Sequence, residues 1–255
     1  MNYRVIVLIL SLFGLAACAP VSSRGGELQT DYDANEIAQA NMRLGVAYME
    51  DGNYEKALEK LERARKADPG YPMAHNMLGL LYQRMGESGK AEESFKRGLR
   101  EAPNNSNLLN NYGQFLCGQN RPDEAEQAFL KARDNPLNDN PARALTNAGT
   151  CAFINNNTDK AETYYRDALQ LNPQQSLALI RMAEIQYGKG EYLSARGYLQ
   201  RYLEVARHTP RSLWLGIRIE RELGDNDTLS SYALLLNSNF PDSEEARLLR
   251  ESGLK

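Results

Sequence analysis

The feature that most restricts the fold of this chain is a small residue, glycine or alanine, that returns at nearly constant spacing. One column of small residues comprises Gly45, Gly79, Gly113, Gly149 and Ala183. A second column, with the same steps of 34, 34, 36 and 34 residues, comprises Ala57, Ala91, Ala125, Ala161 and Ala195. A regular period of this length predicts a stack of similar supersecondary units.

Each period reads as two helices joined by a turn. In the second period, residues 72–85 carry apolar side chains at helical spacing, 86–89 form a turn, and 90–101 resume the helical pattern. Pro103 then ends the second helix, because proline lacks the backbone donor and restricts the residue before it. The small residues lie where the two helices cross, so larger side chains would push the helix axes apart.

The pattern resembles the tetratricopeptide repeat. Numbering each unit from Ala38, Pro72, Ser106, Ala142 and Ser176 places the small residues at position 8 and large apolar residues at position 24. The resemblance implies an all-α, right-handed superhelical solenoid with five clear repeats, near residues 38–71, 72–105, 106–141, 142–175 and 176–210. A sixth, degenerate repeat is expected near 211–244, with Arg218 at position 8. Two columns in phase argue against a helical bundle with chance alanines.

The amino terminus has the features of an export signal. Arg4 precedes an apolar run over residues 5–15, and Leu15-Ala-Ala-Cys18 follows it. The last four residues resemble a bacterial lipobox, which implies a signal peptide over 1–17 and lipidation of Cys18. Ala19 in such proteins implies the periplasmic face of the outer membrane. An ordinary secretory peptide is the alternative. Residues 18–36 are expected to form a flexible tether, and 37–255 the repeat domain.

Two cysteines, Cys117 and Cys151, remain after the lipobox. They occupy similar positions in the first helices of the third and fourth units, which should run side by side. An oxidising periplasm permits a disulfide if the two α-carbons approach within roughly 7 Å. The alternative is a pair of buried free thiols.

Nothing in the sequence indicates catalysis. The formal net charge is −3 and the basic residues are dispersed, which argues against nucleic-acid binding. His75 and His208 have no partners at metal-ligand spacing, and no phosphate-binding loop or nucleophile motif is present. We therefore expect a non-enzymatic, monomeric protein without a metal or cofactor.

A repeat array of this type uses the first helices to bind other proteins. In tetratricopeptide arrays, positions 2, 5, 9 and 12 of these helices point into the concave face. The predicted partner-binding groove has an apolar, methionine-rich end and a middle that carries amides. Its residues are Met42, Val46, Met49, Asn76, Leu80, Gln83, Asn110 and Gln114. Ordinary packing of the methionines and simple hydration of the amides are the alternatives.

Two segments narrow the resemblance further. Residues 108–117, Leu-Leu-Asn-Asn-Tyr-Gly-Gln-Phe-Leu-Cys, and 212–218, Ser-Leu-Trp-Leu-Gly-Ile-Arg, are similar to segments of the PilW/PilF family of type IV pilus biogenesis and stability lipoproteins. Members of that family act as pilotins. The resemblance implies that the partner is a pilus secretin subunit, which the protein helps to reach the outer membrane and to multimerise. The alternative is a general outer-membrane adaptor for cell-wall or envelope-assembly enzymes.

Overall fold

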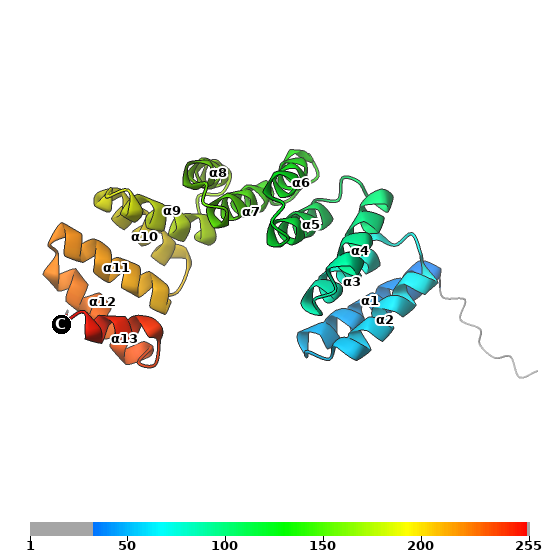
Figure 1. The fold of residues 1–255 in the computed structure, drawn as a ribbon, viewed down its shortest axis with the longest axis horizontal. Coiled ribbons are helices and arrows are strands. Elements are labelled where there is room, and N and C mark those ends of the chain that lie inside the picture. The colour runs from blue at the N-terminus through cyan, green and yellow to red at the C-terminus, as the bar shows by residue number, and fades with distance from the viewer. Residues whose placement is uncertain (1–32, 254–255) are drawn as a thin grey trace, which may run out of the picture. The chain divides into compact units, whose positions relative to one another are not determined.

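The computed structural model describes residues 33–253, which contain thirteen helices and no strand. The helices α1–α12 form six antiparallel pairs that follow one another along the chain (Figure 1). Their bounds are α1 (Ala34–Glu50), α2 (Tyr54–Ala67), α3 (Pro72–Arg84), α4 (Ser88–Glu101), α5 (Ser106–Gly118), α6 (Pro122–Asp134), α7 (Pro141–Ile154), α8 (Thr158–Leu171), α9 (Ser176–Gly188), α10 (Tyr192–Val205), α11 (Pro210–Leu223), α12 (Asn226–Asn239) and α13 (Glu244–Glu251).

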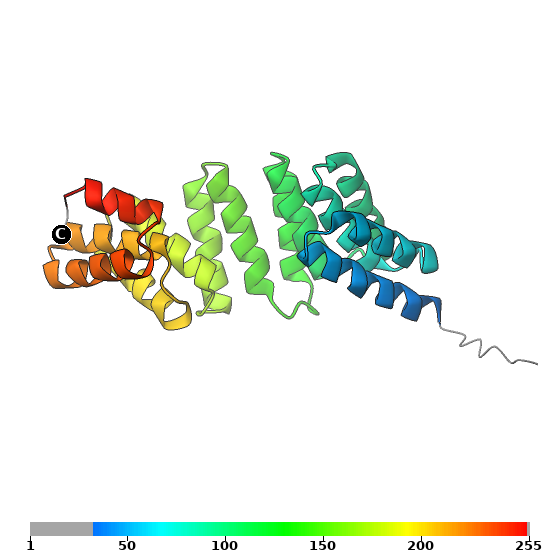
Figure 2. The same cartoon turned by 90° about the horizontal axis from the view of Figure 1, so that it is seen from below.

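The predicted all-α solenoid of tetratricopeptide repeats is confirmed. Figure 2 shows the helix pairs side by side from α1 and α2 to α11 and α12. The predicted signal peptide and Cys18 lie outside the described residues, as does most of the expected tether. Its last three residues, 34–36, belong to the first turn of α1.

The two small-residue columns bring the helices of each pair together. A Cβ atom added at Gly113 would lie 2.6 Å from a ring carbon of Phe129, and one at Gly149 would lie 2.8 Å from the ring of Tyr165. Both aromatic side chains are almost completely buried. A larger residue would have to displace a closely packed ring, which explains why glycine returns at this register.

The sixth helix pair begins at Pro210, one residue before its predicted start at Arg211. The small residue that faces the second helix is Gly216, because a Cβ there would lie 2.8 Å from the ring of Tyr232. Gly216 and Tyr232 are 16 residues apart, as are Gly113 and Phe129. The assignment of Arg218 to this position was wrong, because the sequence step before the last pair is shorter. The alanine of the second column is replaced there by Thr228.

A third column of residues shapes the turn inside each pair. The backbone enters the left-handed region once in each of the six turns, with φ between 59° and 79°. Glycine, and less often asparagine, tolerates this conformation. The residues are Gly52, Gly86, Asn120, Asn156, Gly190 and Gly224. The extra residues of the third repeat lie in the loop between α6 and α7.

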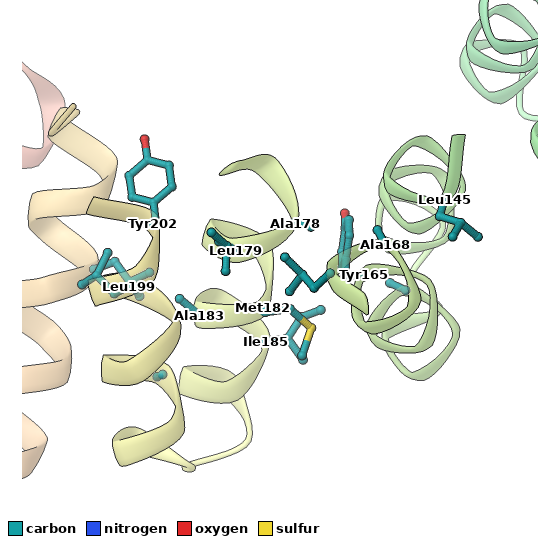
Figure 3. Close-up of a cluster of buried hydrophobic side chains, with 14 of the residues drawn as sticks. Leu145, Tyr165, Ala168, Ala178, Leu179, Met182, Ala183, Ile185, Leu199 and Tyr202 are labelled. Carbon is teal, nitrogen blue, oxygen red and sulfur yellow. The ribbon is translucent and has the colours of Figure 1, made fainter. Parts of the chain in front are cut away.

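The core continues from one pair to the next. In its largest part, buried side chains of α8, α9 and α10 meet, including those of Tyr165, Met182 and Leu199 (Figure 3). At the carboxyl end, α13 packs Ala246 and Leu249 against α11 and α12. This short helix caps the last pair and was not expected from the repeat.

Candidate protein-binding face

We call the surface formed by positions 2, 5, 9 and 12 of α1, α3, α5, α7 and α9 the first-helix face. The eight predicted groove residues do not share one environment. Gln83 and Gln114 are exposed, whereas Met42, Val46 and Leu80 are half-buried. Met49, Asn76 and Asn110 are at most 5% exposed. The structure therefore presents five of the eight predicted side chains to solvent in whole or in part.

Amides inside this face join neighbouring repeats. Asn111 donates from Nδ2 to Oδ1 of Asn76 over 3.0 Å, and Asn147 donates in the same way to Asn110 over 3.1 Å. Asn110 in turn donates to the backbone carbonyl of Ser106 over 2.8 Å. Buried amides need such partners, and the oxygens of Asn76 and Asn110 each accept from an asparagine of the following repeat. Their first role is to fix the register between successive first helices.

The disulfide between Cys117 and Cys151 is present. It joins α5 to α7, with the two α-carbons 5.8 Å apart. The sequence left a bond and two free thiols as alternatives, and the structure contains the bond. Neighbouring helix pairs in such an array are otherwise held together by non-covalent contacts alone. The disulfide adds a covalent link between the third and fourth repeats, at the centre of the described chain.

The disulfide lies beside a pocket of about 470 Å³ on the first-helix face, which we call the central pocket. Two large apolar side chains at its edge are unusually exposed, Ile154 at 65% and Leu177 at 40%. Such side chains at a concave site favour binding of a partner's apolar group. The lining residues are Gln114, Cys117, Gly118, Phe129, Asn147, Thr150, Cys151, Ile154 and Leu177.

Ion pairs link the repeats on the side of the second helices. Glu92 of α4 accepts hydrogen bonds from Lys96 and Arg121, each over 2.8 Å, and these bonds lower its pKa to about 2. Lys160 of α8 pairs with Glu126 of α6 over 2.6 Å, and the Tyr164 hydroxyl also donates to that carboxylate. These contacts connect successive second helices.

His75 has a structural role. His75 is buried, and its Nε2 donates to the carbonyl of Pro69 over 2.9 Å. Burial lowers the pKa of His75 and also that of His208. Between residues 33 and 253 no cluster of His, Cys, Asp or Glu could hold a metal ion. In the same part of the chain, no helix has the length and apolar character needed to cross a bilayer.

Comparison with known proteins agrees with the repeat architecture. Family profiles described as "Tetratricopeptide repeat" match residues 74–105, 104–174 and 152–213, and one described as "TPR repeat" matches 45–86. Fold and sequence together define a tetratricopeptide-repeat protein, a class whose helix pairs serve protein–protein contacts.

Relatives identify the family within this class. The type IV pilus assembly protein PilF of Pseudomonas aeruginosa is 33% identical over 245 residues, which cover 96% of this chain and 97% of PilF. A solved structure of that PilF has a TM-score of 0.75 at 32% identity, covering 86% of this chain and 99% of its own. PilW, described as a widely conserved type IV pilus biogenesis factor, has a TM-score of 0.74 at 32% identity, covering 85% and 99%. The chain belongs to the PilF/PilW family.

Proposed function

We propose that the protein is a pilotin for the type IV pilus secretin. In this proposal a lipid on Cys18 anchors it to the periplasmic face of the outer membrane, and the first-helix face holds a secretin subunit. The protein thereby promotes delivery of the secretin to that membrane and its multimerisation. The similarity to PilF along 96% of the chain carries the proposal. The protein acts as a scaffold and not as an enzyme.

The surface described above suits this role. Met42, Val46 and Leu80 are half-buried apolar residues on the first-helix face, and the central pocket adds exposed apolar edges. Such a surface can take aliphatic side chains of an extended or helical segment. Anchoring to one membrane raises the effective concentration of the two partners, so a weak contact can be well occupied.

The alternative, a general adaptor for envelope-assembly enzymes, requires only a lipid anchor and a repeat array. It gives no reason for similarity along 97% of the length of a pilus assembly protein. An adaptor that shared only the fold would be expected to match PilF over separate repeats, and not along its whole length. The pilotin role is therefore the better supported of the two.

The anchor is tested in a strain that lacks the gene and carries either the original chain or the Cys18→Ser variant. We expect radiolabelled palmitate to enter the original protein but not the variant. We also expect secretin multimers in the outer membrane to fall strongly with the variant, because the protein is no longer held there. Normal multimers without palmitate incorporation would contradict the anchor.

The first-helix face is tested with a variant that carries both Met42→Asp and Val46→Asp. Its matched control carries Leu193→Asp and Leu234→Asp, at second-helix positions that are 73% and 70% exposed. Circular dichroism should show the original helix content in both variants. Co-purification of the secretin should be lost only with the first-helix variant. Equal binding by both folded variants would show that the secretin is held elsewhere.

A further inference from the structure

We propose that the seam between α9 and α11, together with the central pocket, binds an extended acidic peptide that carries one large apolar side chain. The central pocket also belongs to the face that we propose for the secretin, but this inference concerns the chemistry of the ligand and does not require that the ligand is the secretin. Three arginines, which we call the arginine stripe, carry it: Arg181 of α9, and Arg211 and Arg218 of α11.

The arginine stripe begins next to the central pocket. Leu177, at the edge of the pocket, is four residues before Arg181, so both side chains lie on the same side of α9. The guanidinium of Arg181 lies over the ring of Phe153, 5.4 Å from its centroid, and Phe153 directly precedes Ile154 of the pocket. Arg181 therefore lies one helical turn from the edge of the pocket at Leu177.

The stripe continues from α9 to α11. Glu184 of α9 accepts a hydrogen bond from Arg181 over 2.8 Å and another from Arg211 of α11 over 2.5 Å. One turn further along α9, the guanidinium of Arg218 lies only 4.2 Å from the centroid of the Tyr187 ring. Leu177, Arg181, Glu184 and Tyr187 thus form one line along α9, with Arg211 and Arg218 facing it from α11.

The positive charge of this stripe exceeds its negative charge. Among the described residues, Glu184 is the one carboxylate that pairs with these three arginines. Arg218 has no ion pair within residues 33–253, and its described contact is with an aromatic face. Stacking on a ring leaves the N–H groups at the edge of a guanidinium available to carboxylate oxygens. The three arginines and Glu184 together carry a net charge of +2. Because the whole chain has a formal net charge of −3, the stripe is a distinct local feature.

The occupant follows from these groups. Carboxylates complement the excess guanidinium charge, and an aliphatic side chain fits between Ile154 and Leu177. Two helix spacings of about 10 Å each separate α7 from α11, which an extended chain of roughly six residues can span. A peptide fits this surface better than an anionic membrane, because the apolar group must enter a pocket of about 470 Å³ and not a flat interface.

The test uses a fluorescein-labelled peptide with one leucine followed by four glutamates in a glycine–serine background, measured by fluorescence anisotropy on the full chain. A second peptide has glutamine in place of each glutamate. We expect the glutamate peptide to bind about tenfold more tightly, and its binding to weaken with salt, because the contacts are ionic. Equal affinities for the two peptides, or no binding of the glutamate peptide, would overturn the proposal.

Variants locate the contact. Arg211→Gln combined with Arg218→Gln should weaken the glutamate peptide about five- to tenfold and leave the glutamine peptide unchanged. The matched control removes two charges from second helices, Arg63→Gln with Arg166→Gln, whose side chains are 62% and 59% exposed. Leu177→Ser should weaken both peptides. Equal losses in the stripe variant and the control would contradict the stripe as the site.

The lipid alternative is an arm of the same experiment. Vesicles of phosphatidylglycerol and phosphatidylcholine should not displace the glutamate peptide from the original chain. Displacement that depends on Arg211 and Arg218 would reassign the stripe to a membrane surface and overturn the peptide proposal. The assay contains no secretin, so its failure leaves the pilotin proposal intact, and failure of the pilotin assays leaves this inference intact.

Discussion

Reduction of the Cys117–Cys151 disulfide should destabilise the middle of the repeat array selectively. The bond closes a loop of 34 residues. In the loop-entropy description, cross-linking that length removes about 12.6 cal/mol/K from the unfolded chain, which corresponds to about 3.8 kcal/mol at 25 °C. The loop contains α6 and most of α7, so the constraint acts on the interface of the third and fourth repeats.

The position of the bond determines where this loss appears. Repeat arrays open in parts, because each helix pair is stabilised by its own packing and by its neighbours. With the bond intact, α5 and α7 cannot separate even when their packing fluctuates. Without it, we expect amide hydrogen exchange of α5, α6 and α7 to accelerate strongly. Exchange in α1, α2 and α13 should change little, because these helices do not contact the bond.

The assay compares urea unfolding and hydrogen exchange of the purified protein with and without a reductant. A double variant with Cys117→Ala and Cys151→Ala is the control, because the reductant should then have no effect. The expected loss in the free energy of unfolding is about 3–4 kcal/mol, assigned to the middle repeats. A loss below about 1 kcal/mol, or equal acceleration in every helix, would refute the reasoning.

Four further substitutions test the packing. Gly98→Ala should destabilise the protein by about 1–3 kcal/mol, because its Cβ would lie 2.6 Å from a leucine side chain and 3.1 Å from a backbone oxygen. A Cβ at Gly197 would meet open space, so Gly197→Ala should stabilise the protein by up to about 1 kcal/mol through its higher helix propensity. Urea unfolding of the two variants should show these opposite changes in the free energy of unfolding. Burial lowers the pKa of His75, so its protonation favours the unfolded chain, and stability should fall as the pH drops below about 6.5. Thermal unfolding of His75→Gln should show a flatter pH dependence over that range. Leu249→Asp should release α13 and expose Leu213. Increased binding of an apolar dye would report this exposure, and an unchanged dye signal would contradict the role of α13 as a cap.

The period of the small residues was sufficient to predict the helix pairs and their order. A glycine column specifies a close crossing wherever it occurs, since the missing side chain leaves space that an aromatic ring fills. The left-handed turn residues obey the same period, but two of the six are asparagines, Asn120 and Asn156. A search for glycine alone therefore misses that column. The short step before Gly216 similarly hid the true start of the sixth pair.

The exposure of the candidate groove residues was harder to predict. Position 5 faces solvent in an isolated helix, but in the stack it meets the following first helix. Asn76 and Asn110 are buried there and pair with asparagines of the next repeat. Exposure at such positions depends on how closely successive helices approach, and the sequence of one repeat does not contain that information. Their binding role, like that of Met42 and Val46, stays a prediction.

Function in such an array resides in the departures from its repeat. The small-residue columns cannot vary without loss of packing, so they are the same for any ligand. Positions outside them differ along this chain: α5 carries no charged residue, whereas α9 and α11 place Arg181, Arg211 and Arg218 on one seam. The central pocket joins these two regions, because its lining includes Gln114 and Cys117 of α5 and Leu177 of α9. An apolar site that adjoins a cationic one on the same face can discriminate between partners by charge as well as by shape, which a uniform array could not do.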